Sequence, residues 1–322
     1  MAGCSEFALI DDYLSGLGAR REDVSLGVGD DAAVVRAPAG SQQVMALDTL
    51  VEGVHFPADL PAQWVGYRSL AVNLSDIAAM GAQPCWALLG LTLPEVNEAW
   101  VSEFARGLDR LARDSNVALI GGDVTRGPLT ISLQITGFTS TEPLRRDGAL
   151  PGDRLWVSGR PGEAAAGLAV WQSAAAREKA SWQGLKEAFI RPRPRLSLGE
   201  ALGGVASAAI DVSDGLLADA GHIAERSGVK MIFDPDRCQP SVRLQRWAGS
   251  RDAALALFRA GGDDYELCFT APAAADRAVV AAAREARVPV RCVGHAEAGE
   301  GVFWGELRCD KNTTVGYTHF PP

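Results

Sequence analysis

Six aspartates stand at positions where an isolated carboxylate needs a partner. They are Asp31, Asp48, Asp76, Asp123, Asp211 and Asp214. Asp76 is the most telling, because a helix over "SLAVNLSDIAAMGA" places it in one seam with Ser69 and Asn73 between apolar flanks. We expect this helix to be nearly buried, so the Asp76 carboxyl must be protonated, paired or bound to a metal. Taken alone, it could equally be a polar plug hydrogen-bonded to neighbouring backbone.

The same situation recurs at the ends of predicted strands. Asp48 ends the apolar run "VMAL", Asp123 follows "VALIGG", and Asp211 follows "SAAI" with Asp214 shortly after it. Strand ends beside glycine turns are where α/β proteins gather ligand groups. Few bases stand nearby in the sequence to pair with so many acids. The pattern predicts one oxygen-rich site for Mg²⁺, which prefers hard oxygen ligands without Cys or His.

The stretch "LGVGDDAAVV" supports a cation at this site. Its glycines are typical of a phosphate-binding turn, but Asp30 and Asp31 repel an anion unless a metal lies between. Two phosphoryl groups about 5 Å apart, each with about two charges, repel by more than about 10 kcal/mol at an effective dielectric near 20. A carboxylate cage holding several Mg²⁺ ions suits phosphoryl transfer, which needs alignment and charge neutralisation but no covalent nucleophile or strong general base.

The rest of the chain reads as two mixed α/β halves. We expect strands within residues 42–56, 85–94, 117–127, 128–139, 153–159, 207–213, 229–234, 265–272 and 288–294. We expect helices within 5–17, 61–81, 97–116, 162–174, 214–227 and 273–287. Residues 140–154 gather Pro, Gly and charge, so we place a boundary there between a domain at 1–145 and a domain at 146–322.

Composition limits the class of protein. Hydrophobic residues make up 47% and charged residues 22%, as in globular proteins, and the net charge of −9 speaks against a nucleic-acid partner. The six cysteines form no C-x-x-C pair, which favours buried thiols in a reducing compartment. Without a basic leader or a bilayer-length apolar run, we expect a cytoplasmic protein with no membrane contact.

Six motifs in order resemble the thiamine-monophosphate kinases, within the superfamily of aminoimidazole-ribonucleotide synthetase-like enzymes. They are "GVGDDAAV", "DTLVEGVHF", "NLSDIAAMGAQP", "GGDVTRGPL", "DVSDGL" and "GGDDYEL", and the likeness runs to "GYTHF". The resemblance implies a two-domain fold, each domain a mixed sheet covered by helices. It also implies direct transfer of the γ-phosphoryl of ATP to thiamine monophosphate, giving thiamine diphosphate, with several Mg²⁺ ions at the interface of a homodimer.

The resemblance also implies residue roles. The six aspartates would be the metal ligands. Gly122, Asp123, Arg146 and Ser213 would contact ATP, with Arg145 as the alternative to its neighbour. His55, Asp263 and Tyr317 would contact the thiamine substrate, whose thiazolium ring is a cation that a carboxylate or an aromatic face attracts. A merely structural His55 and a Tyr317 that only anchors the carboxyl end are the alternatives.

Two departures from the family pattern affect the fine geometry of the site. Ala46 and Leu47 stand where many relatives carry hydroxyl residues, and Asp263 stands where many carry Glu. The competing functions are a metal-dependent phosphohydrolase, another ATP-using enzyme of the same superfamily, and a nucleotide-binding module without catalysis. The carboxyl end lacks the reactive cysteine tail of a hydrogenase-maturation enzyme, and no Cys or Lys stands near "LGVGDDAAVV" as in a selenophosphate synthetase.

Overall fold

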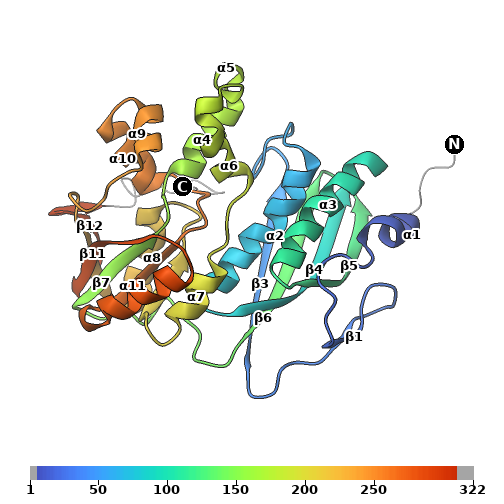
Figure 1. Ribbon diagram of the computed structural model, residues 1–322, viewed down its shortest axis with the longest axis horizontal. Coiled ribbons are helices and arrows are strands. Elements are labelled where there is room, and N and C mark those ends of the chain that lie inside the picture. The colour runs from blue at the N-terminus through green and yellow to red at the C-terminus, as the bar shows by residue number, and fades with distance from the viewer. Residues whose placement is uncertain (1–5, 310–322) are drawn as a thin grey trace. The chain divides into compact units, whose positions relative to one another are not determined.

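The computed structural model describes residues 6–309, and these divide into two compact units (Figure 1). Unit 1 comprises the described residues up to Ile77 together with Ala82–Ser140. Unit 2 comprises Ala78–Gly81 together with the described residues from Thr141 onward. Each unit has its own sheet and its own core, so each is described by itself.

Unit 1 is built on a four-stranded sheet. Its order is β3 (Gln42–Val51), β6 (Thr130–Thr139), β4 (Gln83–Leu93) and β5 (Ala118–Arg126). All neighbours are antiparallel except β4 and β5, which are parallel. A two-stranded ribbon of β1 (Val24–Leu26) and β2 (Val34–Val35) precedes it, after α1 (Glu6–Leu9) and the π-helix η1 (Ile10–Leu14).

Two helices, α2 (Ala62–Ala79) and α3 (Glu98–Asp114), cover one face of this sheet (Figure 1). A Cβ at Gly107 of α3 would overlap the carbonyl oxygen of Gln63, so glycine lets the two helix backbones touch. Asn97 begins α3 by accepting a hydrogen bond from the Trp100 N–H. The prediction of a nearly buried helix is confirmed for α2, in which Asp76 is half-buried among buried neighbours.

Unit 2 is built on a seven-stranded sheet. Its order is β13 (Leu307–Cys309), β12 (Gly301–Trp304), β9 (Val229–Phe233), β11 (Val290–Ala298), β7 (Asp153–Ser158), β10 (Leu267–Pro272) and β8 (Ala208–Asp211). Only β12 and β9 are parallel neighbours.

The helices of unit 2 are mostly short. They are α4 (Glu163–Gln172), α5 (Ala174–Arg177), α6 (Gln183–Ile190), α7 (Leu196–Leu202), α8 (Leu216–Ser227), α9 (Val242–Ala248), α10 (Arg251–Ala260) and α11 (Asp276–Glu285), with 3₁₀ turns η2 (Ala180–Trp182) and η3 (Ala273–Ala275).

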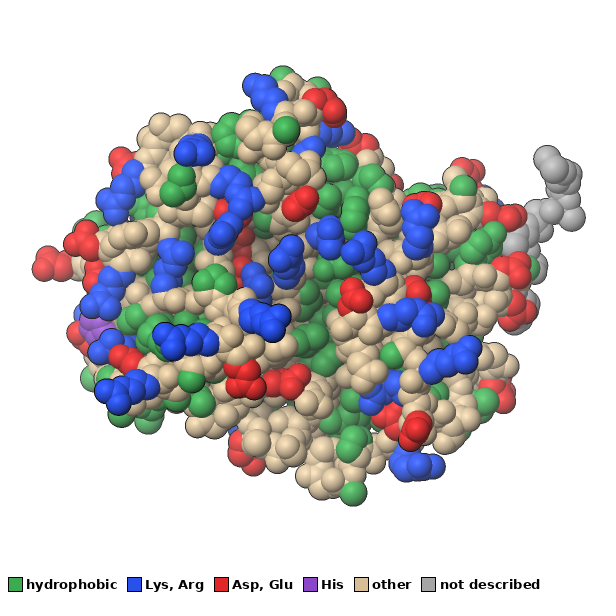
Figure 2. Space-filling view, in the orientation of Figure 1, with side chains coloured by type: hydrophobic (Ala, Val, Ile, Leu, Met, Phe, Trp, Pro, Cys, Tyr) green, Lys and Arg blue, Asp and Glu red, His purple; other side chains and the backbone are tan. Residues whose placement is uncertain are grey.

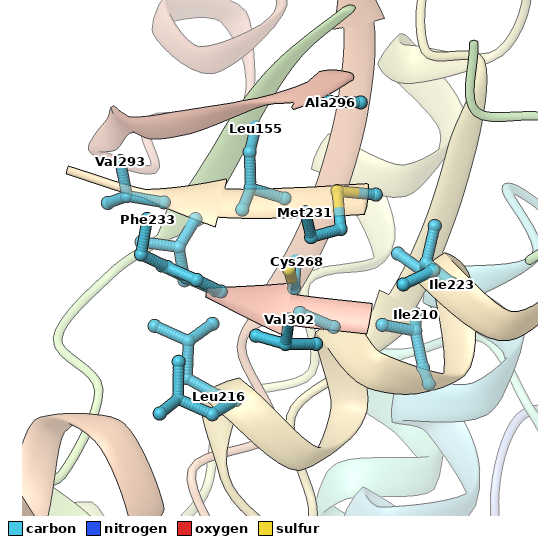
Figure 3. Packing of buried hydrophobic residues seen from close by; sticks show 14 of the residues in the cluster. Leu155, Ile210, Leu216, Ile223, Met231, Phe233, Cys268, Val293, Ala296 and Val302 are labelled. Carbon is cyan, nitrogen blue, oxygen red and sulfur yellow. The ribbon is translucent and has the colours of Figure 1, made fainter. Parts of the chain in front are cut away.

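Side-chain alternation along the strands gives unit 2 a core on each face of its sheet. On one face, Ile210, Met231 and Cys268 pack with Leu216 and Ile223 of α8 (Figure 3). The other face carries a second cluster, in which the Trp156 and Phe269 rings are stacked 6.4 Å apart and α7 and α11 add apolar side chains. The expected mixed fold of two sheets covered by helices is confirmed, and it places the β8–α8 loop at the end of a buried strand.

Several sequence predictions need correction. Asp48 and Asp123 lie inside β3 and β5, not after them, because pairing with β6 and β4 continues past both residues. The helix expected over 5–17 is an α-helical turn that continues as a π-helix to Leu14. Helices α6, α7, α9 and α10 were not predicted at all. The cysteines at 85, 238, 268, 292 and 309 are free thiols, and no helix among the described residues is long and apolar enough to cross a membrane.

Candidate active site

A cavity in unit 1 brings Asp31 and Asp123 together. It has a volume of about 590 Å³ and is lined by the glycine turn before Asp31 and by the middle of β5, including Gly122. The β4–β5 register shifts between Leu119 and Gly121, so a bulge lies just before Gly121. Gly122 has a φ of +153°, and a Cβ there would overlap the carbonyl oxygen of Leu89, so this position, directly before the exposed Asp123, needs a glycine.

Asp48 is tied to the helix that carries Asp76. The backbone N–H of Asp48 donates to Oδ1 of Asn73 at 3.1 Å, and Nδ2 of Asn73 donates to the Ser69 carbonyl at 2.9 Å. Asp76 follows Asn73 by three residues, so it lies on the same side of α2. Burial raises the pKa of the Asp48 carboxyl above its usual value, which means that its charged form lacks compensation in the folded chain.

Three of the unit 1 acids form no ion pair within the described part of the chain. Among residues 6–309, no Lys, Arg or His forms an ion pair with Asp31, Asp48 or Asp123. Some acids of this unit are paired, as Asp23 is with Arg21 at 2.6 Å. Other acids of this unit, such as Glu95 and Asp114, also form no ion pair among the described residues, so these three are distinguished by the cavity that Asp31 and Asp123 line and by the burial of Asp48. A bound cation is the ordinary way to balance such carboxylates.

His55 lies at the end of β3, after a turn at Gly53. The ring Nδ1 of His55 accepts the Val51 N–H at 2.9 Å, and the backbone N–H of His55 donates to the Val51 carbonyl at 2.9 Å. An accepting Nδ1 leaves the proton of the neutral ring on Nε2. The ring is therefore oriented by backbone and half-buried, with a donor on its other nitrogen.

In unit 2, the loop after β8 is organised around Asp219. Oδ2 of Asp219 accepts the backbone N–H groups of Ser213 at 3.1 Å, Asp214 at 3.1 Å and Gly215 at 3.0 Å. Asp211 is the buried last residue of β8, so the loop carries two predicted metal ligands and Ser213 within four residues. The Asp219 side chain therefore fixes the conformation of the loop, because it accepts hydrogen bonds from three backbone N–H groups that no strand or helix satisfies.

Asp219 and His222 are site candidates that the sequence reasoning missed. Asp214, Asp219 and His222 each offer a ligand atom, and these atoms lie within 4.8 Å of one another. Burial, then the charges of Asp211 and Asp214, raise the pKa of Asp219 to about 8. The signal was present in "DVSDGLLADAGH", where Asp219 falls in the first turn of α8 and His222 one turn later.

The segment "GGDDYEL" packs against this loop with unusual backbone geometry. Asp263 N–H donates to the Ser213 carbonyl at 2.7 Å, and Tyr265 N–H donates to the Val212 carbonyl at 2.8 Å. Both residues have positive φ, +71° for Asp263 and +51° for Tyr265. Non-glycine residues in this conformation cost of order 1–3 kcal/mol and gather at functional sites. The strain is consistent with a binding role for Asp263.

Arg145 and Arg146 differ in what holds them. Arg145 forms a bidentate pair with Asp147, in which its Nε lies 2.9 Å from Oδ1. The Arg146 guanidinium is exposed and forms no ion pair among the described residues, while its carbonyl accepts from Ser227 at 2.8 Å. Arg146 is therefore the one with an available guanidinium, which favours it over its neighbour as an anion contact.

The predicted site residues thus fall into groups within the two units. The structure groups Asp31, Gly122 and Asp123 at one cavity, joins Asp48 to the Asp76 helix, and places Asp211, Ser213, Asp214 and Asp263 around one loop. Tyr317 lies outside the described residues. That all six aspartates meet at one metal site stays a prediction.

Comparisons with known proteins identify both halves of the chain. Residues 29–139 match the family model "AIR synthase related protein, N-terminal domain", and residues 151–305 match its C-terminal counterpart. The thiamine-monophosphate kinase of Salmonella typhimurium is 43% identical, with 98% of each chain covered.

Solved structures agree with this assignment. The thiamine-monophosphate kinase of Stenotrophomonas maltophilia K279a is 45% identical, with a TM-score of 0.86 over 94% of this chain and 98% of that one. The structure described as "AaThiL complexed with AMPPCP and TMP" is 31% identical, with a TM-score of 0.80 over 98% and 97%. Hydrogenase maturation protein HypE shares the fold at 18% identity. The chain belongs to the thiamine-monophosphate kinase family of phosphotransferases.

Proposed function

We propose that this protein transfers the γ-phosphoryl group of ATP directly to the phosphate of thiamine monophosphate, giving thiamine diphosphate and ADP. The kinase relative solved with AMPPCP and TMP supports both substrates. The observation that carries the proposal is the set of carboxylates on the β1–β2 turn, β3, β5 and the β8–α8 loop, of which Asp31, Asp48 and Asp123 form no ion pair within residues 6–309. Such carboxylates suit an enzyme that must hold two phosphates together.

The donor set fits Mg²⁺. Asp31, Asp48, Asp76 and Asp123 of unit 1 and Asp211 and Asp214 of unit 2 would hold several ions through carboxylate oxygens. Bound Mg²⁺ supplies neutralisation of the charge on the phosphoryl oxygens. The raised pKa of Asp48 supports this assignment, because a cation would offset the desolvation that now opposes ionisation of that group.

The remaining residues bind and orient the substrates. Gly122 allows the β5 backbone to approach ATP closely. Arg146 offers a guanidinium to the phosphates of ATP, and Ser213 offers a hydroxyl to the same nucleotide. His55 offers its Nε2 proton, and the Asp263 carboxylate attracts the thiazolium cation. The Tyr317 ring is assigned to the same substrate by motif. The acceptor is a phosphate already ionised near neutral pH, so alignment replaces a general base.

We also propose that the working form is a homodimer with the unit 1 sheet at its interface. One face of this sheet exposes Met45 and Leu47 by 62% each and Leu88 by 40%. Leu47 and Leu88 both pair with Gln134 of β6, so they lie on the same face. Exposed large apolar side chains grouped on one sheet face are typical of an interface. The domain roles follow: residues 1–145 bind metal and ATP and dimerise, and 146–322 complete the nucleotide and substrate sites.

The test is product identity. Purified protein with ATP, Mg²⁺ and thiamine monophosphate should form thiamine diphosphate and ADP in equal amounts. Free phosphate released at the same rate without the acceptor would contradict the proposal and favour a phosphohydrolase.

A further inference from the structure

A second cavity, in unit 2, is lined by six arginines although the protein as a whole carries a net charge of −9. Its volume is about 340 Å³, within the range of about 300–1,000 Å³ found for small-molecule sites. The arginines are Arg160, Arg191, Arg193, Arg195, Arg243 and Arg287. No predicted metal, ATP or thiamine residue within the described part of the chain lines this cavity.

Three of these arginines belong to the segment "RPRPR", residues 191–195, between α6 and α7. Each proline fixes its own φ and keeps the preceding residue out of the helical region. The backbone that carries Arg191, Arg193 and Arg195 is therefore stiff before any ligand arrives. A stiff backbone lowers the ordering entropy that binding would otherwise cost.

Three of the four acids in the cavity wall, Glu163, Asp264 and Glu266, are already engaged, and the fourth, Glu187, is exposed and accepts a hydrogen bond from the Gln183 amide at 3.2 Å. Glu266 accepts two hydrogen bonds from Arg195, at 2.6 and 2.5 Å, and one from Ser158 at 2.5 Å. Asp264 accepts the backbone N–H groups of Gly162 at 2.6 Å and Ala164 at 3.1 Å, and burial raises its pKa well above the usual value. These two carboxyl groups therefore do little to cancel the remaining arginines.

Glu163 is also engaged. It accepts from the Ser241 hydroxyl and lies 3.7 Å from Nε of Arg243 and 4.0 Å from Arg160. By contrast, Arg193 and Arg287 are exposed and form no ion pair among the described residues. The cavity thus holds guanidinium groups in excess of the carboxylates that could neutralise them.

A neighbouring cavity extends this basic wall. It has a volume of about 670 Å³, shares Arg160 and Arg243 with the first, and adds Arg246 and Arg291. Figure 2 shows Lys and Arg side chains gathered over α6 and the segment that follows it. Guanidinium forks match phosphate oxygens in bidentate geometry.

We propose that this arginine-lined cavity of unit 2 binds the diphosphate group of a small molecule without a metal ion. The volume of the cavity suits a small molecule, and several guanidinium forks suit two linked phosphates better than a single carboxylate. The carboxylates of the candidate active site need a cation before they accept a phosphate, whereas this cavity supplies the positive charge itself. Inorganic pyrophosphate and the diphosphate tail of an organic ester share the chemistry that it recognises.

The test is calorimetric titration of the full-length protein with pyrophosphate, and separately with ADP, in buffer that contains EDTA. Wild type should bind at one site, and added salt should weaken the binding. The Arg193→Gln/Arg243→Gln variant should bind at least about tenfold more weakly. The matched control, Arg277→Gln/Arg284→Gln on the exposed side of α11, should bind within about twofold of wild type. Tighter binding of ADP than of pyrophosphate would identify an ester as the source of the diphosphate.

Two results would overturn the proposal. One is the absence of saturable metal-free binding to wild type, or equal binding by the Arg193→Gln/Arg243→Gln variant. The other is loss of metal-free binding in Arg146→Gln, which would place the ligand at the predicted ATP contact instead. If the double variant does not fold by circular dichroism, Arg193→Gln alone serves, because this side chain is exposed. The outcome is separate from the kinase assay, which depends on Mg²⁺ and thiamine monophosphate.

Discussion

The two units present their acids in different ways. In unit 1, Asp48, Asp76 and Asp123 stand on two strands and a buried helix, held by register and packing. In unit 2, Asp214 stands on a loop whose backbone donors converge on Asp219. Regular elements keep their shape when a site residue is changed, whereas the loop depends on a side chain that is itself part of the acidic cluster. In unit 1, substitution of an acid should therefore change turnover without changing the free energy of unfolding. In unit 2, substitution of an acid should change both.

The largest expected effect is on turnover in unit 1. Asp76→Asn keeps the shape of the side chain but removes a charge, so turnover should fall by about 10²–10³-fold. Thermal unfolding should be unchanged or improved, since a half-buried charge in a buried helix is removed. Steady-state kinetics and calorimetry measure both, with Asp114→Asn at the exposed end of α3 as the control. A folded Asp76→Asn with normal turnover would refute the metal role.

The exposed sheet face offers a second contrast between the units. Leu47→Lys should convert the proposed dimer to a monomer, because it puts a charge among apolar side chains on the unit 1 sheet. Leu307→Lys, at a 74% exposed position on β13 of unit 2, should leave the mass unchanged. Light scattering after size exclusion gives the mass of each. A wild-type monomer, or a dimeric Leu47→Lys, would remove the sheet face as the interface.

Asp219 tests the dependence of the unit 2 loop on one acceptor. Asp219→Ala leaves the N–H groups of Ser213, Asp214 and Gly215 without their partner and should lower the free energy of unfolding by about 2–3 kcal/mol. Asp219→Asn retains a carbonyl oxygen there and should cost about 1 kcal/mol or less. Urea unfolding measures the free energy of unfolding of each variant. Equal losses would mean that the acceptor oxygen does not hold the loop.

The smallest effect is a pH dependence at Asp264. Burial raises its pKa in the folded chain, so the folded state keeps a proton that the unfolded state loses near 3.8. This contribution to stability is complete at acid pH and is lost as pH rises through the folded pKa. The stability of Asp264→Asn relative to wild type should therefore increase with pH above about 4. Urea titrations across pH measure it, with Asp114→Asn for comparison, and a constant difference would contradict the burial argument.

The sequence predicted elements with strong periodicity and missed those without it. Helix α2 was expected from Pro61 onward because its apolar residues surround a single polar seam, and it begins at Ala62. The short helices α6, α7 and α9 carry too few turns to show a helical period. Helix α10 was missed although it is as long as the predicted helix α4. Asp48 and Asp123 were expected after strands because an acid reads as a strand end, whereas pairing with neighbouring strands carries both strands past them.

For the candidate site, motif order was the strongest signal. It indicated the family that the comparisons then showed, and it pointed to Asp211 and Asp214 on one loop. It did not reveal Asp219, whose role depends on three backbone donors that only the folded loop brings together. The arginine-lined cavity was invisible for the same reason, since Arg160, Arg243 and the 191–195 segment are far apart in the chain.

The most direct test of the central claim is a Mg²⁺ titration of the kinase reaction with ATP labelled in its γ-phosphoryl group. The account predicts that all transferred label appears in the terminal phosphate of thiamine diphosphate, that the rate rises with Mg²⁺ to a power above one, and that EDTA or Asp123→Asn abolishes it. Label transfer that persists at full rate in EDTA, or that ends in free phosphate while thiamine monophosphate is unchanged, would contradict it.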